Sequence, residues 1–406
     1  MNQKTELQQW KPKWSLFGLV ALLFFALPLM SVLVTSLTDS KLEKNKYELW
    51  SWEIKHLPNA LISNIRKSNS SINENRIAVL EYFRLTSLLR TELAKPLPEE
   101  LILKNLEDER KKLEDSVEIF LQVLIHNAIK EVQLTTQFPL LKNTSVVWPP
   151  VAIELETPPL VLVRSDRNKI TRKGDTLLKP GLSEETIISI ENETDSDETA
   201  SLVVQIGGLA TYPSSVLNLR TYSTVLETAA HEWIHHYLAF HPLGQKYWDS
   251  QRLREINETT ANIAGRAIAD LIERKNPLAF PKNMGGRTGV EKEKVASINI
   301  SDEFRNLRKQ VDELLNKGKI AEAESLMLKT QEFFNANGFN IRKINQAYFA
   351  FYGTYTDLPQ SSSPIGPKIK EIWKLTGKNI GVFLTTMRTI SSVNDLDEIL
   401  ATFREK

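Results

Sequence analysis

The chain has 406 residues, a charged fraction of 25% and a formal net charge of +1, so its composition is that of an ordinary folded protein without a basic bias toward nucleic acid. It contains no cysteine, which excludes disulfides, thiolate metal ligands and a cysteine nucleophile. The length is sufficient for two packed units.

The N-terminal segment has the pattern of a membrane anchor. Residues 1–13 are polar and carry Lys4, Lys11 and Lys13, and residues 14–38 form an uncharged, almost wholly apolar run. A run above about 18 apolar residues is long enough to cross a bilayer, and lysines before it place the N-terminus in the cytoplasm. We expect a cytoplasmic tail, one transmembrane helix and an extracytoplasmic remainder, as in a bacterial membrane protein. A cleavable signal peptide is the alternative.

Helices are expected on both sides of a central region. Residues 39–147 form a membrane-proximal region, in which apolar residues from Leu103 onward recur with a helical period. Residues 281–406 form a C-terminal region that also has helical patterns, interrupted near Gly318 and between Pro359 and Pro367.

Residues 148–280 combine a small predicted sheet with two helices. Short apolar or alternating runs between turn residues predict strands over 151–156, 160–164, 175–178 and 186–191. A further strand over 202–208 ends in Gly207-Gly208, where a substrate backbone can approach closely. We interpret it as a sheet edge that pairs with an extended peptide. The alternative is a core strand that ends in a turn.

The residues His231-Glu232-Trp233-Ile234-His235 form a His-Glu-x-x-His pattern, which is typical of zinc peptidases. On a helix the two histidines lie about 40° apart, so both imidazoles can reach one ion. Zinc lowers the pKa of a bound water to about 7, and Glu232, which projects beside this face, is placed to take its proton. The pattern lies in a stretch free of Pro and Gly, so a helix is expected. A core helix with two surface histidines is the alternative.

Catalytic zinc usually has three protein ligands, and Glu258 is the first candidate for the third. The segment Asn257-Glu258-Thr259-Thr260-Ala261 resembles the Asn-Glu-x-x-Ala element of gluzincins, the zinc peptidases with two His and one Glu as ligands. The resemblance covers roughly 200–265. It implies His231, His235 and Glu258 as Zn²⁺ ligands and Glu232 as general base. Glu255, one turn earlier on the same face, is a neighbouring partner or an alternative ligand.

Two other interpretations of the site remain open. His241 has the spacing of the third histidine in the longer metzincin motif, but that motif needs Gly where this chain has Leu238. The second interpretation is a membrane-tethered domain without catalysis, whose zinc site is structural or vestigial. An open fourth coordination position, expected for three ligands, does not favour a structural site.

Zincin catalysis also needs a donor for the oxyanion that forms when water attacks. Histidine is absent after residue 241, so a tyrosine of the segment 345–355 is the natural substitute. Tyr352 is the first candidate, followed by Tyr348 and Tyr355. A tyrosine-rich helix packed over the core is the alternative.

The sequence therefore predicts an α+β protein. Its zincin-like core over 148–280 has a small sheet with an edge strand, an active-site helix and a ligand helix, and helical regions flank it. The predicted function is that of a membrane-anchored zinc metallopeptidase acting on a peptide or protein substrate, with no nucleic-acid partner.

Overall fold

The computed structural model describes residues 40–56, 72–137, 145–280 and 299–405. The expected cytoplasmic tail and transmembrane anchor, residues 1–38, lie outside these residues. Within the described part of the chain, no helix has both the length and the apolar character of a membrane span.

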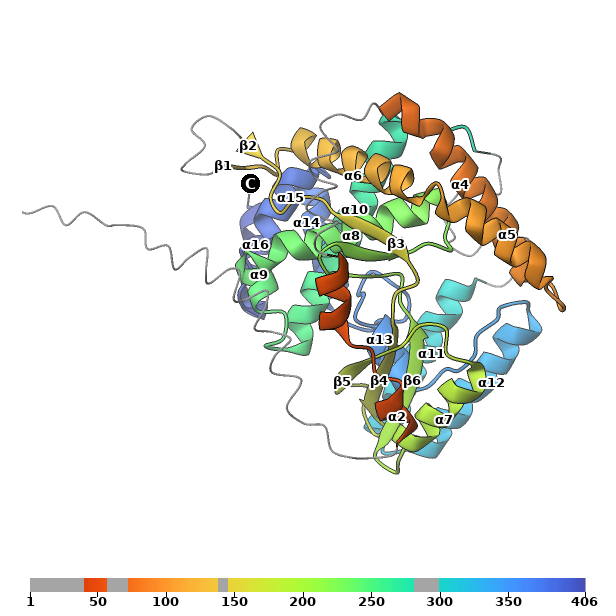
Figure 1. Ribbon diagram of the computed structural model, residues 1–406. Helices are drawn as coiled ribbons and strands as arrows, with labels where there is room; N and C mark the ends of the chain where they lie inside the picture. Colours follow the sequence, from red (N-terminus) through yellow and green to blue (C-terminus); the bar gives the residue numbers. More distant parts are fainter. Residues whose placement is uncertain (1–39, 57–71, 138–144, 281–298, 406) are drawn as a thin grey trace, which may run out of the picture.

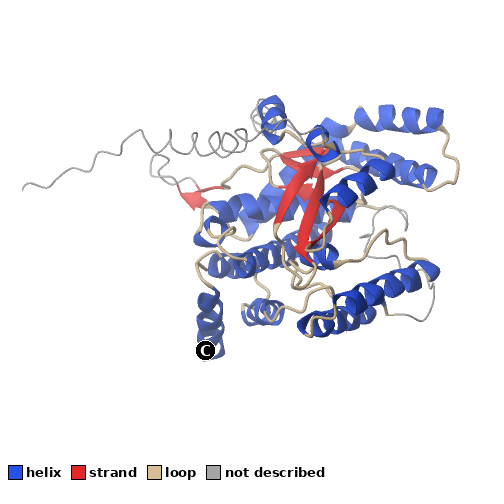
Figure 2. Ribbon diagram, turned by 90° about the horizontal axis from the view of Figure 1, so that it is seen from below, coloured by secondary structure: helices blue, strands red, loops and turns tan. Residues whose placement is uncertain are grey.

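Helices account for most of the described structure, and strands form three small sheets (Figures 1 and 2). The labelled helices are α2 (Lys41–Lys44), α4 (Ile72–Leu93), α5 (Glu100–Lys111), α6 (Glu114–Glu131), α7 (Glu184–Thr194), α8 (Tyr222–Ala239), α9 (Pro242–Gln245), α10 (Gln251–Lys275), α11 (Ile300–Asn316), α12 (Ile320–Ala336), α13 (Gln346–Tyr352), α14 (Ile365–Leu375), α15 (Ile380–Met387) and α16 (Val393–Arg404). The strands are β1 (Thr136–Gln137), β2 (Ser145–Val146), β3 (Ile153–Glu156), β4 (Leu160–Asp166), β5 (Gly174–Leu178), β6 (Thr199–Gln205), β7 (Gly208–Leu209) and β8 (Ser214–Leu217).

The largest core surrounds α8 and α10 in the upper part of Figure 1. It includes residues of α4 and α6 from the membrane-proximal region and of α14, α15 and α16 from the C-terminal region. The sheet β3-β8-β7 lies along this core, with β3 parallel to β8 and β7 antiparallel to it. The helix pair α8 and α10, which carries the predicted site, is therefore packed against residues from the regions before and after it in the sequence.

The second sheet, β5-β4-β6, is antiparallel and is covered on both faces. Val161 and Val163 of β4 pack with α11, α12 and α13, whereas Leu160 and Leu162 pack on the side of α7. Successive strand residues point to opposite faces, so two covered faces explain why the strand is apolar without alternation. In Figure 2 the strands lie between helices on both sides.

Most of the expected strands are confirmed within one or two residues, but the strand predicted over 186–191 is wrong, because α7 covers these residues. The Ser183 side chain caps this helix by accepting a hydrogen bond from the Thr186 backbone N–H at 3.2 Å, and two glutamates occupy its first turn. Ile187 and Ile190, one turn apart, then pack onto the sheet. Capping and packing override the strand preference of β-branched residues.

The predicted strand over 202–208 divides into two. Its first part belongs to β6, an end strand of β5-β4-β6, and its last residue begins β7, an end strand of β3-β8-β7. The two sheets thus meet at Ile206-Gly207, directly beside α8, with which β7 is in contact.

Candidate metal centre

The two helices of the predicted site begin at ordinary N-terminal caps. The Thr221 side chain accepts a hydrogen bond from the Thr224 backbone N–H at the start of α8, and the Ser250 side chain accepts one from the Leu253 N–H at the start of α10. The helices cross closely at Gly265, where an added Cβ would lie 3.0 Å from the backbone nitrogen of His231. Glycine at this position lets α10 approach the backbone of α8 at the first predicted ligand.

The side chains of His231, His235 and Glu258 converge at this crossing. The two histidine Nε2 atoms lie 2.9 Å apart, and Glu258 Oε2 lies 3.5 Å from His231 Nε2 and 3.4 Å from His235 Nε2. Corners of a tetrahedron around zinc, with bonds of about 2.0–2.1 Å, are separated by roughly 3.3 Å. The three ligand atoms therefore have the spacing of three corners of one coordination sphere, and the residues fit a zinc ion.

Two further side chains orient these groups. Asn257 donates a hydrogen bond through Nδ2 to the Leu243 carbonyl at 3.2 Å, so its Oδ1 faces His235 Nδ1, 2.9 Å away, and accepts from it. His235 is thereby held with its Nδ1 protonated and its Nε2 available. The Tyr247 hydroxyl donates to Glu258 Oε1 at 2.5 Å, which leaves Oε2 directed at the histidines.

The charges within the cluster support one another. Burial raises the pKa of Glu258, but His235 and His231 outweigh it and hold this pKa well below its usual value. Burial lowers the pKa of His235, yet Glu258, with Glu232 and Asn257, raises it to about 9. Glu258 thus remains an anion, and a cation that binds the histidines must displace a proton from His235.

Glu232 is buried beside the cluster and beneath β7. Burial raises its pKa, the two histidines lower it and Glu258 raises it, and the net pKa is above the usual value for a glutamate. The strand passes so close that a Cβ added at Gly208 would lie 2.5 Å from Glu232 Oε1 and 2.7 Å from Thr228 Cγ2. Only a glycine backbone therefore fits over the carboxylate here.

Of the three candidate tyrosines, Tyr355 is the one that the structure brings to the cluster. Its ring lies 6.2 Å from that of His231, and burial, followed by the charge of Glu258, raises its pKa well above the usual value. Tyr352, the first sequence candidate, instead packs on Tyr348 at 4.5 Å within the core of the second sheet. The helix α13 ends at Tyr352, and Tyr355 lies in the turn that follows.

The turn that carries Tyr355 is fastened to α10 just after Glu258. The Thr356 backbone N–H donates to Thr259 Oγ1 at 2.9 Å, and the two threonine hydroxyls lie 2.7 Å apart. Asn262 Nδ2 donates to both carboxylate oxygens of Asp357 at 3.0 and 2.9 Å. The position of Tyr355 is therefore tied to the same helix that presents the predicted glutamate ligand.

The alternative ligands lie elsewhere. Among the described residues, the group of His and acidic side chains able to share an ion is His231, His235 and Glu258, and His241 is not a member. His241 is the N-cap residue of α9, with its ring 4.7 Å from that of Tyr237. Glu255 accepts hydrogen bonds from Ser363 Oγ at 2.7 Å and from Gln251 Nε2 at 3.1 Å, away from the histidines.

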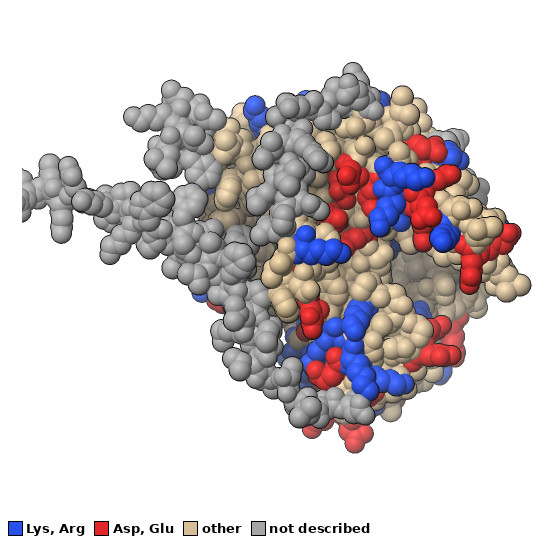
Figure 3. All heavy atoms as spheres, viewed as in Figure 1, with Lys and Arg blue, Asp and Glu red and all other residues tan. Residues whose placement is uncertain are grey.

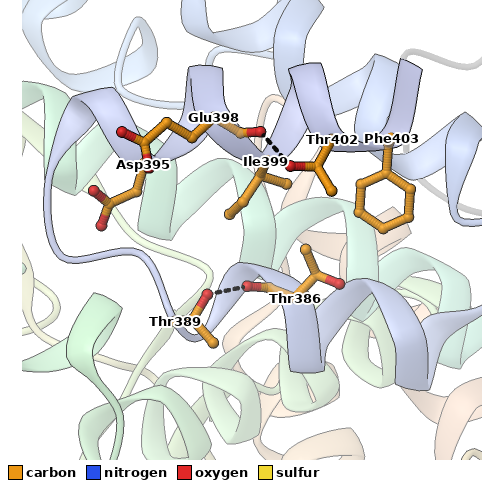
Figure 4. Close-up of a pocket in the computed structure, with 7 residues that line it drawn as sticks. All are labelled: Thr386, Thr389, Asp395, Glu398, Ile399, Thr402 and Phe403. Atoms are coloured by element: carbon orange, nitrogen blue, oxygen red, sulfur yellow. Dashed lines mark hydrogen bonds between the residues drawn. The ribbon is translucent and has the colours of Figure 1, made fainter. Parts of the chain in front are cut away.

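A separate pocket of about 440 Å³ lies between α15 and α16 (Figure 4). Its threonine hydroxyls Thr389 and Thr402 donate to backbone carbonyls of their own helical turns, and Asp395 is engaged in the cap of α16. These polar groups are satisfied internally, and the residues of the metal cluster do not line the pocket.

Sequence reasoning missed Tyr247 and the positioning role of Gly265. Tyr247 lies in the short connection between α9 and α10, where no periodic pattern exists to place its side chain. Gly265 follows Glu258 by two helical turns and so lies on the same face of the helix. This spacing is the one sequence feature that could have indicated a close helix contact beside Glu258. Comparison with protein-family models, with curated proteins and with solved structures finds no match.

Proposed function

We propose that this chain is a zinc-dependent peptidase of the gluzincin type, with His231, His235 and Glu258 as metal ligands. The observation that carries the proposal is the convergence of these three side chains at tetrahedral spacing, with the buried carboxylate of Glu232 beside them. Three ligands leave a coordination position open, which is typical of catalytic rather than structural zinc.

The roles of the neighbouring residues follow from their contacts. Asn257 keeps His235 in the tautomer that presents Nε2, and Tyr247 restricts Glu258 to presenting one oxygen. Gly265 sets the distance between the helices that carry these ligands. A bound zinc ion would act as a Lewis acid and would lower the pKa of water at the site.

The chain supplies the proton transfers and the charge stabilisation. Glu232, whose pKa burial raises above its usual value, takes a proton from the water that attacks the peptide carbonyl and passes it to the leaving nitrogen as the C–N bond breaks. Tyr355 keeps its proton and donates a hydrogen bond to the oxygen on which negative charge develops. Because β7 is an end strand of its sheet, an extended substrate would pair with its free edge at Gly208.

The membrane anchor over 14–38 and the extracytoplasmic placement of the catalytic part belong to the same proposal. They are supported by the uncharged apolar run and by the lysines that precede it.

Hydrolysis of a diverse set of fluorogenic peptides by the full-length protein in detergent, beside Glu232→Gln, tests this function. We expect the variant to retain its zinc and to lose about 10²–10⁴-fold in rate. Glu227→Gln is the matched control, because Glu227 is a carboxylate on the same helix that pairs with Arg266 instead. Equal hydrolysis by the parent and Glu232→Gln would rule out this mechanism, and a parent that binds zinc but cleaves no peptide would favour the non-catalytic interpretation.

A further inference from the structure

Trp248, in the connection between α9 and α10, presents a large aromatic side chain to solvent. Its exposed fraction is 73%, against 43% for Trp50 and for Phe333, and no other Trp or Phe among the described residues is as exposed. A single exposed apolar side chain needs no special explanation by itself. Trp248 is different because the residue before it, Tyr247, contacts the metal cluster.

The contacts of Tyr247 place Trp248 beside the cluster. The Tyr247 hydroxyl binds Glu258 Oε1, its ring lies 6.3 Å from that of His235, and the Trp248 ring lies 4.7 Å from the Tyr247 ring. These ring distances put the indole within about 11 Å of the His235 ring, a span that three to four residues of an extended peptide cover at about 3.3 Å each. The side chains of His231 and His235 remain 12% and 15% exposed, so the cluster can be reached from solvent.

The indole is held in place from two directions. The connection is closed by a hydrogen bond from the Asp249 backbone N–H to the Lys246 carbonyl at 3.1 Å, and the side chains of the same two residues form an ion pair at 2.8 Å. The Arg254 guanidinium, on α10, lies 4.6 Å from the centre of the Trp248 ring and 5.3 Å from that of the Tyr247 ring. The arginine therefore ties the exposed ring to the ring that contacts Glu258.

Stacking on these two rings is the interaction that the structure gives Arg254. Within the part of the chain that the structure describes, its guanidinium makes no hydrogen bond or ion pair, and its Nε is buried without an acceptor. Contact of a guanidinium with an aromatic face is favourable, most of all with Trp. A ring fixed in this way loses little freedom when a ligand packs against it, which favours binding.

The chemistry of this position favours an apolar ligand group. Aromatic and aliphatic side chains pack well on an indole, whereas the positive charge of Arg254 against the same ring disfavours a Lys or Arg side chain. The net charge is +1, and on the face shown in Figure 3 acidic and basic side chains are interspersed, so neither sign dominates that face. A local apolar contact is then a better source of selectivity than long-range attraction.

We infer that Trp248, held by Arg254, is a specificity-determining residue that binds a large apolar or aromatic side chain of the peptide, within three to four residues of the cleaved bond. That the ligand is a peptide rests on the proposed function above. The preference itself is a property of binding, so it can be measured without hydrolysis.

The test uses fluorescence anisotropy on the full-length Glu232→Gln protein in lipid nanodiscs, with binding to empty nanodiscs subtracted. The probes are fluorescein-labelled pools of eight-residue peptides with a background of small polar residues. Each peptide carries one variable residue, which is Phe, Trp or Leu in the first pool, Ala in the second, Glu in the third and Lys in the fourth. Trp248→Ala and Trp248→Phe are compared with Phe333→Ala, the matched control, because Phe333 is an exposed aromatic residue of α12 whose ring lies 6.0 Å from that of Phe334.

We expect the first pool to bind about tenfold or more tightly than the second. Trp248→Ala should remove most of this difference while retaining its zinc, and Trp248→Phe and Phe333→Ala should keep most of it. Equal binding of all pools, tighter binding of the Glu pool, or no measurable binding would each overturn the inference. An equal loss for all pools in Trp248→Ala would also overturn it, because it would mean that the side chain only supports Tyr247.

Hydrolysis of the same pools by the parent is scored separately. Cleavage without a preference for the first pool contradicts the role of Trp248 alone. A binding preference that depends on Trp248, without cleavage of any pool, contradicts the peptidase function alone.

Discussion

Replacement of Asn257 should separate metal binding from folding at the proposed zinc site. Asn257 is 1% exposed and makes two hydrogen bonds, one that accepts from His235 Nδ1 and one that donates to the Leu243 carbonyl. Asn257→Ala removes both. Loss of a group that orients a metal ligand typically weakens metal affinity about 10–100-fold, which corresponds to about 1.4–2.8 kcal/mol. The unsatisfied buried carbonyl of Leu243 costs about 1–3 kcal/mol of folding free energy.

Asn257→Asp is the matched variant, because it retains an acceptor for His235 and loses the donor to Leu243. A carboxylate that faces a carbonyl is repelled by it, so this variant should lose at least as much stability as Asn257→Ala. Its zinc affinity should nevertheless stay close to that of the parent, since His235 keeps its orientation.

The two effects need two assays. Zinc affinity is measured by competition with a chromophoric chelator, and stability is measured from the unfolding midpoint of chelator-treated protein, so that bound metal does not contribute to it. Zinc affinity of Asn257→Ala within twofold of the parent, or an equal loss of affinity in the Ala and Asp variants, would refute the argument that this side chain orients His235.

Three further substitutions have distinct expected outcomes. Gly208→Ala should retain zinc but reduce peptide hydrolysis, because its Cβ would meet Glu232 Oε1 at 2.5 Å; metal content and rate measured together check this, and an unchanged rate contradicts it. Tyr355→Phe should lower kcat by about 10²–10³-fold, as expected for loss of one oxyanion donor, with KM nearly unchanged, whereas Tyr352→Phe should leave kcat unchanged; steady-state kinetics distinguishes the two residues. Burial, followed by repulsion from neighbouring acids, raises the pKa of Glu118 well above its usual value. The folded state therefore keeps its full stability below the unfolded-state pKa near 4.5 and loses part of it as the pH rises through the folded-state pKa of Glu118. Relative to the parent, Glu118→Gln should therefore stabilise the protein more at pH 8 than at pH 4. Thermal unfolding at pH 8 and pH 4 measures this, and an equal effect at both pH values, or a larger one at pH 4, would refute it.

The active-site helix of the proposed metal site could be anticipated from the sequence because its signal is local. The spacing of His231 and His235 places both imidazoles on one face of any α-helix, whatever surrounds it. The contact of Glu258 with that face depends on how the two helices pack. The sequence predicted this contact only through the resemblance to gluzincins. The structure adds the physical reason, which is the close helix crossing at Gly265.

The tertiary positions of two tyrosines near the cluster could not be derived from local patterns. Tyr355 and Tyr247 lie in turns: Tyr247 contacts Glu258 of α10 directly, and Tyr355 is held by the bond of its neighbour Thr356 to Thr259 of α10. The strand predicted over 186–191 was wrong for a different reason, because the N-terminal cap and the packing of α7 outweigh the strand preference of its isoleucines.

Zinc analysis of the full-length protein, purified without added metal or chelator, shows whether His231, His235 and Glu258 bind a metal when the parent is compared with Glu258→Ala and Glu255→Ala. Glu255 is a buried carboxylate one turn earlier on the same helix, so it controls for the loss of a buried acid. If these three residues bind zinc, we expect about one zinc per chain in the parent and in Glu255→Ala, and much less in Glu258→Ala. A parent without zinc, or equal zinc in the parent and in Glu258→Ala, would contradict it.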